Sequence, residues 1–347
     1  MLNHIIQEDC KSVAGELGKD IYKLEGANIL ITGAFGMLAS YLVYLLMYAN
    51  ENIFKKPAQL YLVTRSKKKK FGSNKNLHYL SLDITKEKPS VTNMHYIIHA
   101  ASKAAPKLYE ENMIDTLNSN ILGLYNLLAI CNKNTRSFLF FSSAEIYGSV
   151  GKAVDEGYIG TVDHLSPRSC YVEAKKVCET ICMNYFREKN IPVKIVRIFH
   201  TFGPGVNLSD GRIFNDFIKY GLEKKDIKIS GNPKLERSFL YIKDATTMFL
   251  KILVSEKNGE IYNVGGDNNI TTVEGFANIV CSTFNILNKQ KNYVLLKQNK
   301  DKEYYENAVK CIKPSLKKFK RDFNYQPTTT IEKAVQRTVR YLIEEIE

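Results

Sequence analysis

Residues 28–40 have the sequence Asn-Ile-Leu-Ile-Thr-Gly-Ala-Phe-Gly-Met-Leu-Ala-Ser, and this stretch decides the fold of the 347-residue chain. Its first five residues form the apolar run of a buried strand, and the residues after Gly36 have the spacing of a helix. Gly33 permits a tight turn between them, and Gly36 lets the backbone approach a pyrophosphate at the helix N-terminus. Ala39 replaces the third glycine of a dinucleotide fingerprint and still allows close packing. Glycine in a turn can be purely steric, but this position after a first strand favours a dinucleotide site.

Similar apolar runs recur along the first two thirds of the chain, at residues 59–63, 78–80, 96–98, 137–141 and 193–198. Segments with helical spacing separate them, such as residues 39–48 and 120–131. Apolar strands that alternate with helices predict a parallel sheet covered on both faces. The expected fold class is therefore α/β, a Rossmann-type doubly wound parallel sheet.

The pattern changes after about residue 200, where loops rich in Gly, Asn and Asp separate short strands at 227–229, 239–242 and 260–264. This change indicates a smaller C-terminal substrate-binding lobe, and a cleft between the lobes is the natural ligand site. We expect an N-terminal helical extension over 1–22, an NAD(P)-binding Rossmann domain over 23–201 with a return segment at about 236–262, and a substrate-binding lobe over 202–235 and 263–347.

Two late helices carry start signals. Thr271-x-x-Glu274 and Thr329-x-x-Glu332 have the spacing of capping boxes, in which a hydroxyl and a carboxylate satisfy free amides of the first turn. In the last helix, one face is predicted to pack through Ile331, Val335, Leu342 and Ile346.

The composition limits the partners. Lys and Arg number 49 against 36 Asp and Glu, a formal net charge of +13, which favours anionic partners. The densest basic run, residues 65–70, is short and lacks aromatic partners, so we expect a solvated loop and no nucleic-acid binding. No apolar run is long enough to span a bilayer and no signal peptide precedes the first strand, so we expect no membrane association.

Seven cysteines form no CxxC pair, and no histidine cluster has metal-ligand spacing. We therefore expect a reduced, cytoplasmic protein without a metal site. Cys178 and Cys182 are four residues apart on a predicted helix, and we interpret them as core thiols rather than a metal or redox pair.

The second strand ends at Thr64-Arg65-Ser66 without the carboxylate that would hold the ribose of NAD. Arg65 could instead bind the 2′-phosphate of NADP, or belong to the solvated loop. Asp83, just after the third strand, can accept a hydrogen bond from an adenine amine, or it can cap a turn.

Tyr171 and Lys175 lie one helical turn apart, so both side chains point the same way. A nearby cation lowers the pKa of a phenol, which could then take the proton of an alcohol as hydride leaves. The same spacing occurs elsewhere by chance, so the context decides. The strand over 138–141 delivers Ser142 to Gly148 at its carboxyl end, which faces the ligand in an open parallel sheet.

Together these motifs resemble one known family. The set is Gly33-x-x-Gly36, Asp83, His99-Ala100-Ala101, Asn120-x-x-Gly123, Ser143-x-Glu145-x-Tyr147-Gly148, Tyr171 with Lys175, and Arg237-Ser238-Phe239-x-Tyr241-Ile242-x-Asp244. It is similar to that of the extended short-chain dehydrogenase/reductase family of NAD-dependent nucleotide-sugar epimerases, dehydratases and decarboxylases, over residues 24–265. Within the family, residues 166–171, 177–180, 197–204 and 209–212 most resemble the UDP-glucuronate decarboxylases.

The resemblance implies a role for each catalytic residue. Tyr171 would be the acid/base at the sugar 4-hydroxyl, and Lys175 would lower its pKa and hold the nicotinamide ribose. Ser143 would share the hydrogen bond to the 4-oxygen, and Glu145 would act near C5. Ala144 stands where dehydratases have an aspartate, which disfavours dehydration.

The resemblance also implies the ligands, a nucleotide sugar and NAD, with NADP possible. Arg237 would meet the diphosphate or an anionic group of the sugar, and Arg212 the nucleotide end. The expected cofactor-binding residues are Gly33, Phe35, Gly36, Met37, Arg65, Asp83, Ile84, Ala100, Ala101 and Lys175. The expected substrate-binding residues are Ser143, Glu145, His200, Arg212 and Arg237.

Several outcomes stay open within the family. His200 stands where decarboxylases have Asn, and Gly205 where they have Arg, so the pocket departs from the usual one. A 4-epimerase, a C4 dehydrogenase and a 4-keto-sugar reductase are alternatives to the decarboxylase, and an inactive nucleotide-binding regulator is a remote one. A homodimer is implied by the resemblance. The first twenty residues exceed what the family needs.

Overall fold

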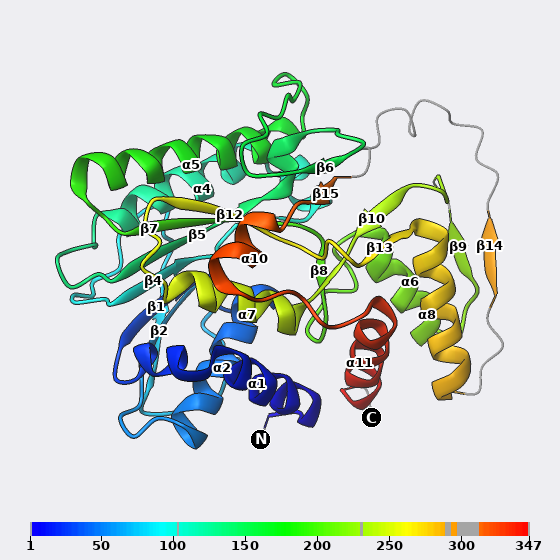
Figure 1. Cartoon of the computed structure of the whole chain (residues 1–347), viewed down its shortest axis with the longest axis horizontal. Coiled ribbons are helices and arrows are strands. Elements are labelled where there is room, and N and C mark those ends of the chain that lie inside the picture. Colours follow the sequence, from blue (N-terminus) through cyan, green and yellow to red (C-terminus); the bar gives the residue numbers. More distant parts are fainter. Residues whose placement is uncertain (1, 103, 230–231, 289–292, 297–311, 346–347) are drawn as a thin grey trace.

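A seven-stranded parallel sheet forms the centre of the protein (Figure 1). The computed structural model describes residues 2–102, 104–229, 232–288, 293–296 and 312–345. The strands are ordered β12-β7-β5-β4-β1-β2-β3, and every neighbouring pair is parallel. Their bounds are β1 (Asn28–Thr32), β2 (Gln59–Thr64), β3 (Leu77–Ser81), β4 (Tyr96–His99), β5 (Ser137–Ser143), β7 (Val193–Ile198) and β12 (Glu260–Val264). The predicted α/β class and doubly wound parallel sheet are confirmed.

Helices cover both faces of this sheet, as Figure 1 shows. Ile29 and Ile31 of β1 pack in one core with α1, α2 and α7, whereas Leu30 packs in a second core with α4 and α5. Alternate residues of a strand point to opposite faces, so an uninterrupted apolar run fills both layers. The helices are α1 (His4–Leu17), α2 (Met37–Asn52), α7 (Ile242–Leu253), α4 (Met113–Leu128) and α5 (Ser169–Lys189).

Shorter elements from the second half of the chain gather beside the carboxyl edge of the sheet (Figure 1). They include two small sheets, β8 (Thr201–Phe202) with β11 (Leu240–Tyr241) and β10 (Glu236–Ser238) with β13 (Ile270–Thr272). The others are α6 (Ile213–Leu222), β9 (Ile227–Ile229), α8 (Val273–Asn288), β14 (Val294–Leu296), β15 (Lys313–Pro314) and α11 (Ile331–Glu344). Helix α10 (Lys317–Phe323) packs against β12. Short connecting elements are η1 (Gly18–Leu24), α3 (Pro106–Glu111), η2 (Ala144–Tyr147) and β6 (Ala153–Val154).

The predicted starts of the last helices are wrong by one residue. Thr272, not Thr271, accepts the first-turn amide of α8, from Gly275 at 2.9 Å. Thr330, not Thr329, caps α11 by accepting from the amide of Lys333.

The amide of Thr329 instead donates to Asp244 of α7 at 3.0 Å, a tertiary contact that local spacing does not reveal. The predicted strand over 239–242 is also shorter, because α7 begins at Ile242. Ile331 and Val335 are buried as predicted and Leu342 is half-buried, while Ile346 lies outside the described residues.

A buried ion pair joins α5 to the centre of the sheet. Arg197 of β7 donates to Glu179 of α5, with Nη2 2.7 Å from Oε2 and Nε 3.0 Å from Oε1. The same carboxylate accepts from Ser142 at 2.5 Å, and Arg197 also donates to the hydroxyl of Tyr147 at 2.9 Å. The pair therefore holds α5 and the end of β5 in a fixed relation.

Glu179→Gln should lower the free energy of unfolding by about 3 kcal/mol, because it leaves the Arg197 guanidinium buried without a counterion. Glu173→Gln is the matched control on the same helix, since Glu173 pairs with Lys176 near the surface, and it should cost less than about 1 kcal/mol. Urea unfolding measures both, and equal losses would show that the buried pair contributes no more than the surface pair.

Candidate active site

The turn after β1 forms a narrow backbone cradle at the carboxyl edge of the sheet. Gly33 has φ +65°, and a Cβ there would lie 2.8 Å from the Cα of Ala101. The amide of Gly36 donates to the carbonyl of Gly33 at 2.9 Å, and α2 begins at the next residue with no side chain capping it. The geometry fits a pyrophosphate, because uncapped amides at a helix N-terminus bind anions.

Two further contacts shape this cradle. The hydroxyl of Thr32 accepts from the amide of Ala101 at 3.1 Å and lies 2.9 Å from Nδ1 of His99, so the strand ends of β1 and β4 are joined. Burial lowers the pKa of His99 to about 3, which keeps the ring neutral. On the solvent side, the ammonium of Lys70 donates to the carbonyl of Phe35 at 3.1 Å and adds positive charge beside the turn.

The predicted catalytic residues meet where β5 ends beside α5. Tyr171 is 5% exposed, and the neighbouring Ser143 acts to lower the pKa of its phenol. Lys175 is buried, donates to the carbonyl of Phe141 at 2.7 Å and lies 5.6 Å from the centroid of the Tyr171 ring. The structure therefore brings Ser143, Tyr171 and Lys175 together as the sequence predicts.

The predicted pKa shift of the phenol is wrong in this structure. The pKa of Tyr171 is raised to about 12, first by burial and then by the negative charge of Glu145, and these outweigh the hydrogen bond with Ser143. Burial also lowers the pKa of Lys175 to about 8. The ammonium of Lys175 lies over the ring and donates to the carbonyl of Phe141.

Glu145 lies in a cluster that sequence reasoning missed. Its Oε2 is 3.4 Å from the hydroxyl of Tyr109, which also accepts from Arg168 at 3.0 Å. The ring of Tyr109 stacks on that of Tyr171, with centroids 5.1 Å apart and planes 8° from parallel. Burial raises the pKa of Glu145, although the charges of Arg168 and Arg212 oppose the shift.

No periodic signal marks Tyr109, which lies in the short helix α3 and reaches the site only through tertiary packing. Arg168 lies in residues 166–171, which resemble the UDP-glucuronate decarboxylases. This resemblance is the sequence signal that could have identified Arg168.

His200 and the two predicted arginines lie on the side of the small lobe. The ring of His200 lies beside Phe214 and Phe239, at centroid distances of 5.5 and 6.4 Å. The surrounding protein lowers the pKa of His200 to about 3, with further contributions from Arg237 and Arg212, although solvent reaches its side chain. His200 is therefore a neutral group beside two cations.

Both arginines have polar partners: Asp210 and Ala104, which is distant in the sequence, for Arg212, and Glu236 for Arg237. Arg212 donates to the carbonyl of Ala104 at 3.0 Å and pairs with Asp210 at 3.6 Å. Arg237 donates to the carbonyl of Glu236 at 2.9 Å.

The residues predicted to read the adenosine end of the cofactor lie apart from this cluster. Arg65 is exposed and its Nη1 is 4.0 Å from Asp115. Asp83 accepts hydrogen bonds from the amide and the hydroxyl of Thr85 at 3.0 and 2.9 Å, so it caps a turn. The hydrogen bond from the amide lowers the pKa of Asp83. Their contacts with a cofactor stay predictions.

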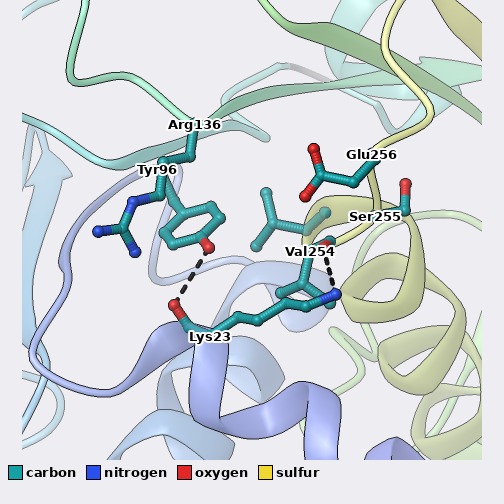
Figure 2. Close-up of a pocket in the computed structure, with 7 residues that line it drawn as sticks. Lys23, Tyr96, Arg136, Val254, Ser255 and Glu256 are labelled. Atoms are coloured by element: carbon teal, nitrogen blue, oxygen red, sulfur yellow. Dashed lines mark hydrogen bonds between the residues drawn. The ribbon is translucent and has the colours of Figure 1, made fainter.

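A cavity of about 330 Å³ lies at the opposite edge of the sheet, where the strands begin (Figure 2). Lys23 donates to the carbonyl of Val254 at 3.2 Å, and Tyr96 donates to that of Lys23 at 3.1 Å. Arg136 and Glu256 complete its charged lining. No residue predicted for the site lines this cavity.

Three findings bear on other ligands. Within the described residues, no group of three His, Cys, Asp or Glu side chains is placed to hold a metal. Cys178 and Cys182 are fully buried free thiols, so their interpretation as core residues is confirmed. Among the helices of the described residues, none combines the length and the apolar character needed to cross a bilayer.

A parallel Rossmann sheet, with a glycine cradle at its carboxyl edge and a buried tyrosine and lysine beside it, defines a class of dinucleotide-dependent proteins. The chain belongs to the NAD dependent epimerase/dehydratase family, whose model matches residues 29–265. The family predicted from the motifs is therefore confirmed.

The chain is similar to both decarboxylases and epimerases of this family. UDP-glucuronic acid decarboxylase 6 of Arabidopsis thaliana is 30% identical over 248 residues, 71% of this chain and 71% of that protein. The UDP-glucose 4-epimerase of Thermotoga maritima, solved with UDP-glucose, has a TM-score of 0.77 at 22% identity, covering 92% of this chain and 100% of that one. The UDP-glucuronic acid 4-epimerase of Bacillus cereus, solved with NAD, has a TM-score of 0.72 at 20% identity, with 92% and 100% covered. At this identity the solved structures show the shared fold.

Gly33→Ala should weaken NAD binding by at least about tenfold and cost more than about 1 kcal/mol of stability, because the new Cβ meets the backbone of Ala101 at a positive φ. Isothermal titration with NAD and urea unfolding measure the two effects.

Gly15→Ala is the control. Gly15 lies in α1, and a Cβ at this position would have no other atom within 4 Å, so this change should add about 0.5–1 kcal/mol of stability and leave NAD binding unchanged. Unaltered NAD affinity in Gly33→Ala would exclude the cradle as the pyrophosphate site.

Proposed function

We propose that this protein is an NAD-dependent UDP-glucuronate decarboxylase that acts through transient oxidation at the sugar C4. The observation that carries the proposal is the group of Tyr171, Ser143 and Glu145 at the carboxyl edge of the sheet, with Lys175 buried beneath. The 30% identity to a UDP-glucuronic acid decarboxylase over 71% of the chain supports this substrate.

The cofactor would lie across the carboxyl ends of β1 and β4. The residues that would hold it are Gly33, Phe35, Gly36, Met37, Asp83, Ile84, Ala100, Ala101 and Lys175. Bound NAD supplies a hydride acceptor that returns the hydride within the same turnover. We propose NAD rather than NADP because the family is NAD-dependent and because Arg65, the residue predicted for a 2′-phosphate, lies 4.0 Å from Asp115.

The protein's own groups would move the protons. As the phenolate, Tyr171 would take the proton of the 4-hydroxyl and later return it, while Ser143 would hold the 4-oxygen. A carboxylate beta to the resulting ketone loses CO2, because the electron pair of the broken C–C bond is delocalised as an enolate. Burial raises the pKa of Glu145, which favours the protonated carboxyl that could then donate to C5.

A 4-epimerase acting on the same substrate is the second candidate. His200 and Gly205 depart from the decarboxylase pattern, and the fold is shared with a UDP-glucuronic acid 4-epimerase over 92% of the chain. An epimerase would return the hydride to the other face of the sugar and keep the carboxylate. Loss of CO2 separates the two.

Tyr171→Phe should lower CO2 release from UDP-glucuronate by at least about 1000-fold, because it removes the proton-transfer group. Binding of UDP-glucuronate should stay within about a few-fold, since little contact area is lost. Mass spectrometry of the product and isothermal titration measure the two. Tyr185→Phe, on the same helix but away from the site, is the control and should retain full activity. Unchanged turnover in Tyr171→Phe would exclude the mechanism.

We also propose a homodimer formed through α4 and α5. Exposed apolar side chains gather on these helices, namely Met113, Ile114, Leu122, Tyr125 and Val177. An exposed apolar patch on a folded protein is typical of an interaction surface. A second copy of the chain would bury this patch symmetrically, since the same surface serves both partners of a two-fold dimer.

Ile114→Glu should convert the dimer to a monomer, because it would place two carboxylates in the apolar interface. Ile286→Glu is the control: Ile286 of α8 is 76% exposed, as Ile114 is 75% exposed, but lies on another surface. Light scattering after size exclusion gives the mass of each variant. A wild-type monomer, or a dimer that tolerates Ile114→Glu, would contradict the proposed interface.

A further inference from the structure

Helix α1 lies outside the part of the chain that matches the family, yet it is packed into the structure (Figure 1). It contacts α2 and α7 and buries Ile6, Cys10, Val13 and Leu17 in the main core. It also carries a carboxylate, Asp9, that is only 3% exposed. A buried carboxylate needs charged and hydrogen-bonding partners, so its partners show what α1 is joined to.

Asp9 joins three elements that are far apart in the sequence. Its Oδ2 accepts from the hydroxyl of Tyr41 in α2 at 3.0 Å and from that of Tyr241 in β11 at 2.6 Å. Its Oδ1 is 2.8 Å from Nη2 of Arg337 in α11. Arg337 also donates to the hydroxyl of Tyr241 at 3.2 Å, so both groups hold the same phenol.

A second carboxylate of α1 extends these contacts. Glu16 accepts from Lys243 at 2.6 Å and from Thr247 at 2.7 Å, both in α7. Lys243 in turn pairs at 2.9 Å with the fully buried Asp244, which accepts from the hydroxyl of Tyr325. The start of α7, directly after β11, is therefore held by α1 as well.

The strand that carries Tyr241 leads to the proposed substrate residues. In β11, Leu240 pairs with Thr201 of β8, and the amide of Leu240 donates to the carbonyl of His200 at 2.9 Å. Arg237 lies three residues before Leu240 on the same segment. A shift of β11 would therefore move both His200 and Arg237.

We propose that α1 positions the substrate side of the site: Asp9, through the hydroxyl of Tyr241, fixes β11 against β8 and so sets the places of His200 and Arg237. Asp9 and Tyr241 are thus positioning residues, and the inference rests on the proposed function for the roles of His200 and Arg237. It also gives the N-terminal segment a part in substrate recognition.

Two phenylalanine variants distinguish an effect on the position of β11 from a general loss of protein stability. Each variant removes one hydroxyl that donates to the same oxygen of Asp9. Tyr241→Phe should raise KM for UDP-glucuronate at least about fivefold with kcat within about twofold. It should also speed amide hydrogen exchange in residues 199–202 and 238–241 at least about tenfold, through local opening of the β8–β11 pair. Tyr41→Phe, which removes the hydroxyl on α2, should change neither, although thermal unfolding should show a similar loss of stability in both variants.

Equal KM and equal exchange rates in the two variants would overturn the proposal. If the wild type releases CO2, faster exchange in Tyr241→Phe without a higher KM would overturn it as well. The exchange measurement needs no substrate. If the wild type releases no CO2, the proposed function fails, while the difference in exchange between the variants still decides whether α1 holds β11 in place.

Discussion

The parallel register of β1, β4 and β5 is the constraint on which the site depends. Thr32 pairs with His99, and His99 pairs with Phe140. The residues that follow these positions therefore emerge side by side at one edge: the glycine turn, the Ala100–Ala101 segment and the end of β5. In an open parallel sheet this edge binds the ligand. The bond between Thr32 and His99 fixes the edge locally, and the pair of Glu179 and Arg197 fixes α5 against it.

Burial then decides the electrostatics of the site. It raises the pKa of Tyr171 and Glu145 and lowers that of Lys175, so each shift favours the neutral form. For Lys175 the neutral form gains as pH rises through about 8. The permanent positive charge near the site belongs to arginines, which suits an anionic nucleotide sugar.

Patterns within a few residues predicted most of the fold and the centre of the site. The run at 28–32, its glycine turn and the strand before Ser143 were identified because burial on both faces and tight turns leave local signatures. Tyr109 and the role of α1 were not predicted, since their contacts join segments distant in sequence. The cap of α11 is misplaced by one residue for a related reason: a tertiary bond to Asp244 takes the amide of Thr329. Spacing also gave no measure of desolvation, so the pKa of Tyr171 was predicted in the wrong direction.

Mass spectrometry of the product formed from UDP-glucuronate with deuterium at C4 tests whether oxidation at C4 is transient. A hydride that leaves C4 and returns from the same bound cofactor gives a UDP-pentose that has lost CO2 and kept its deuterium. A decarboxylated product without deuterium would show that the hydride does not return, and conversion with the carboxylate intact would exclude the decarboxylase.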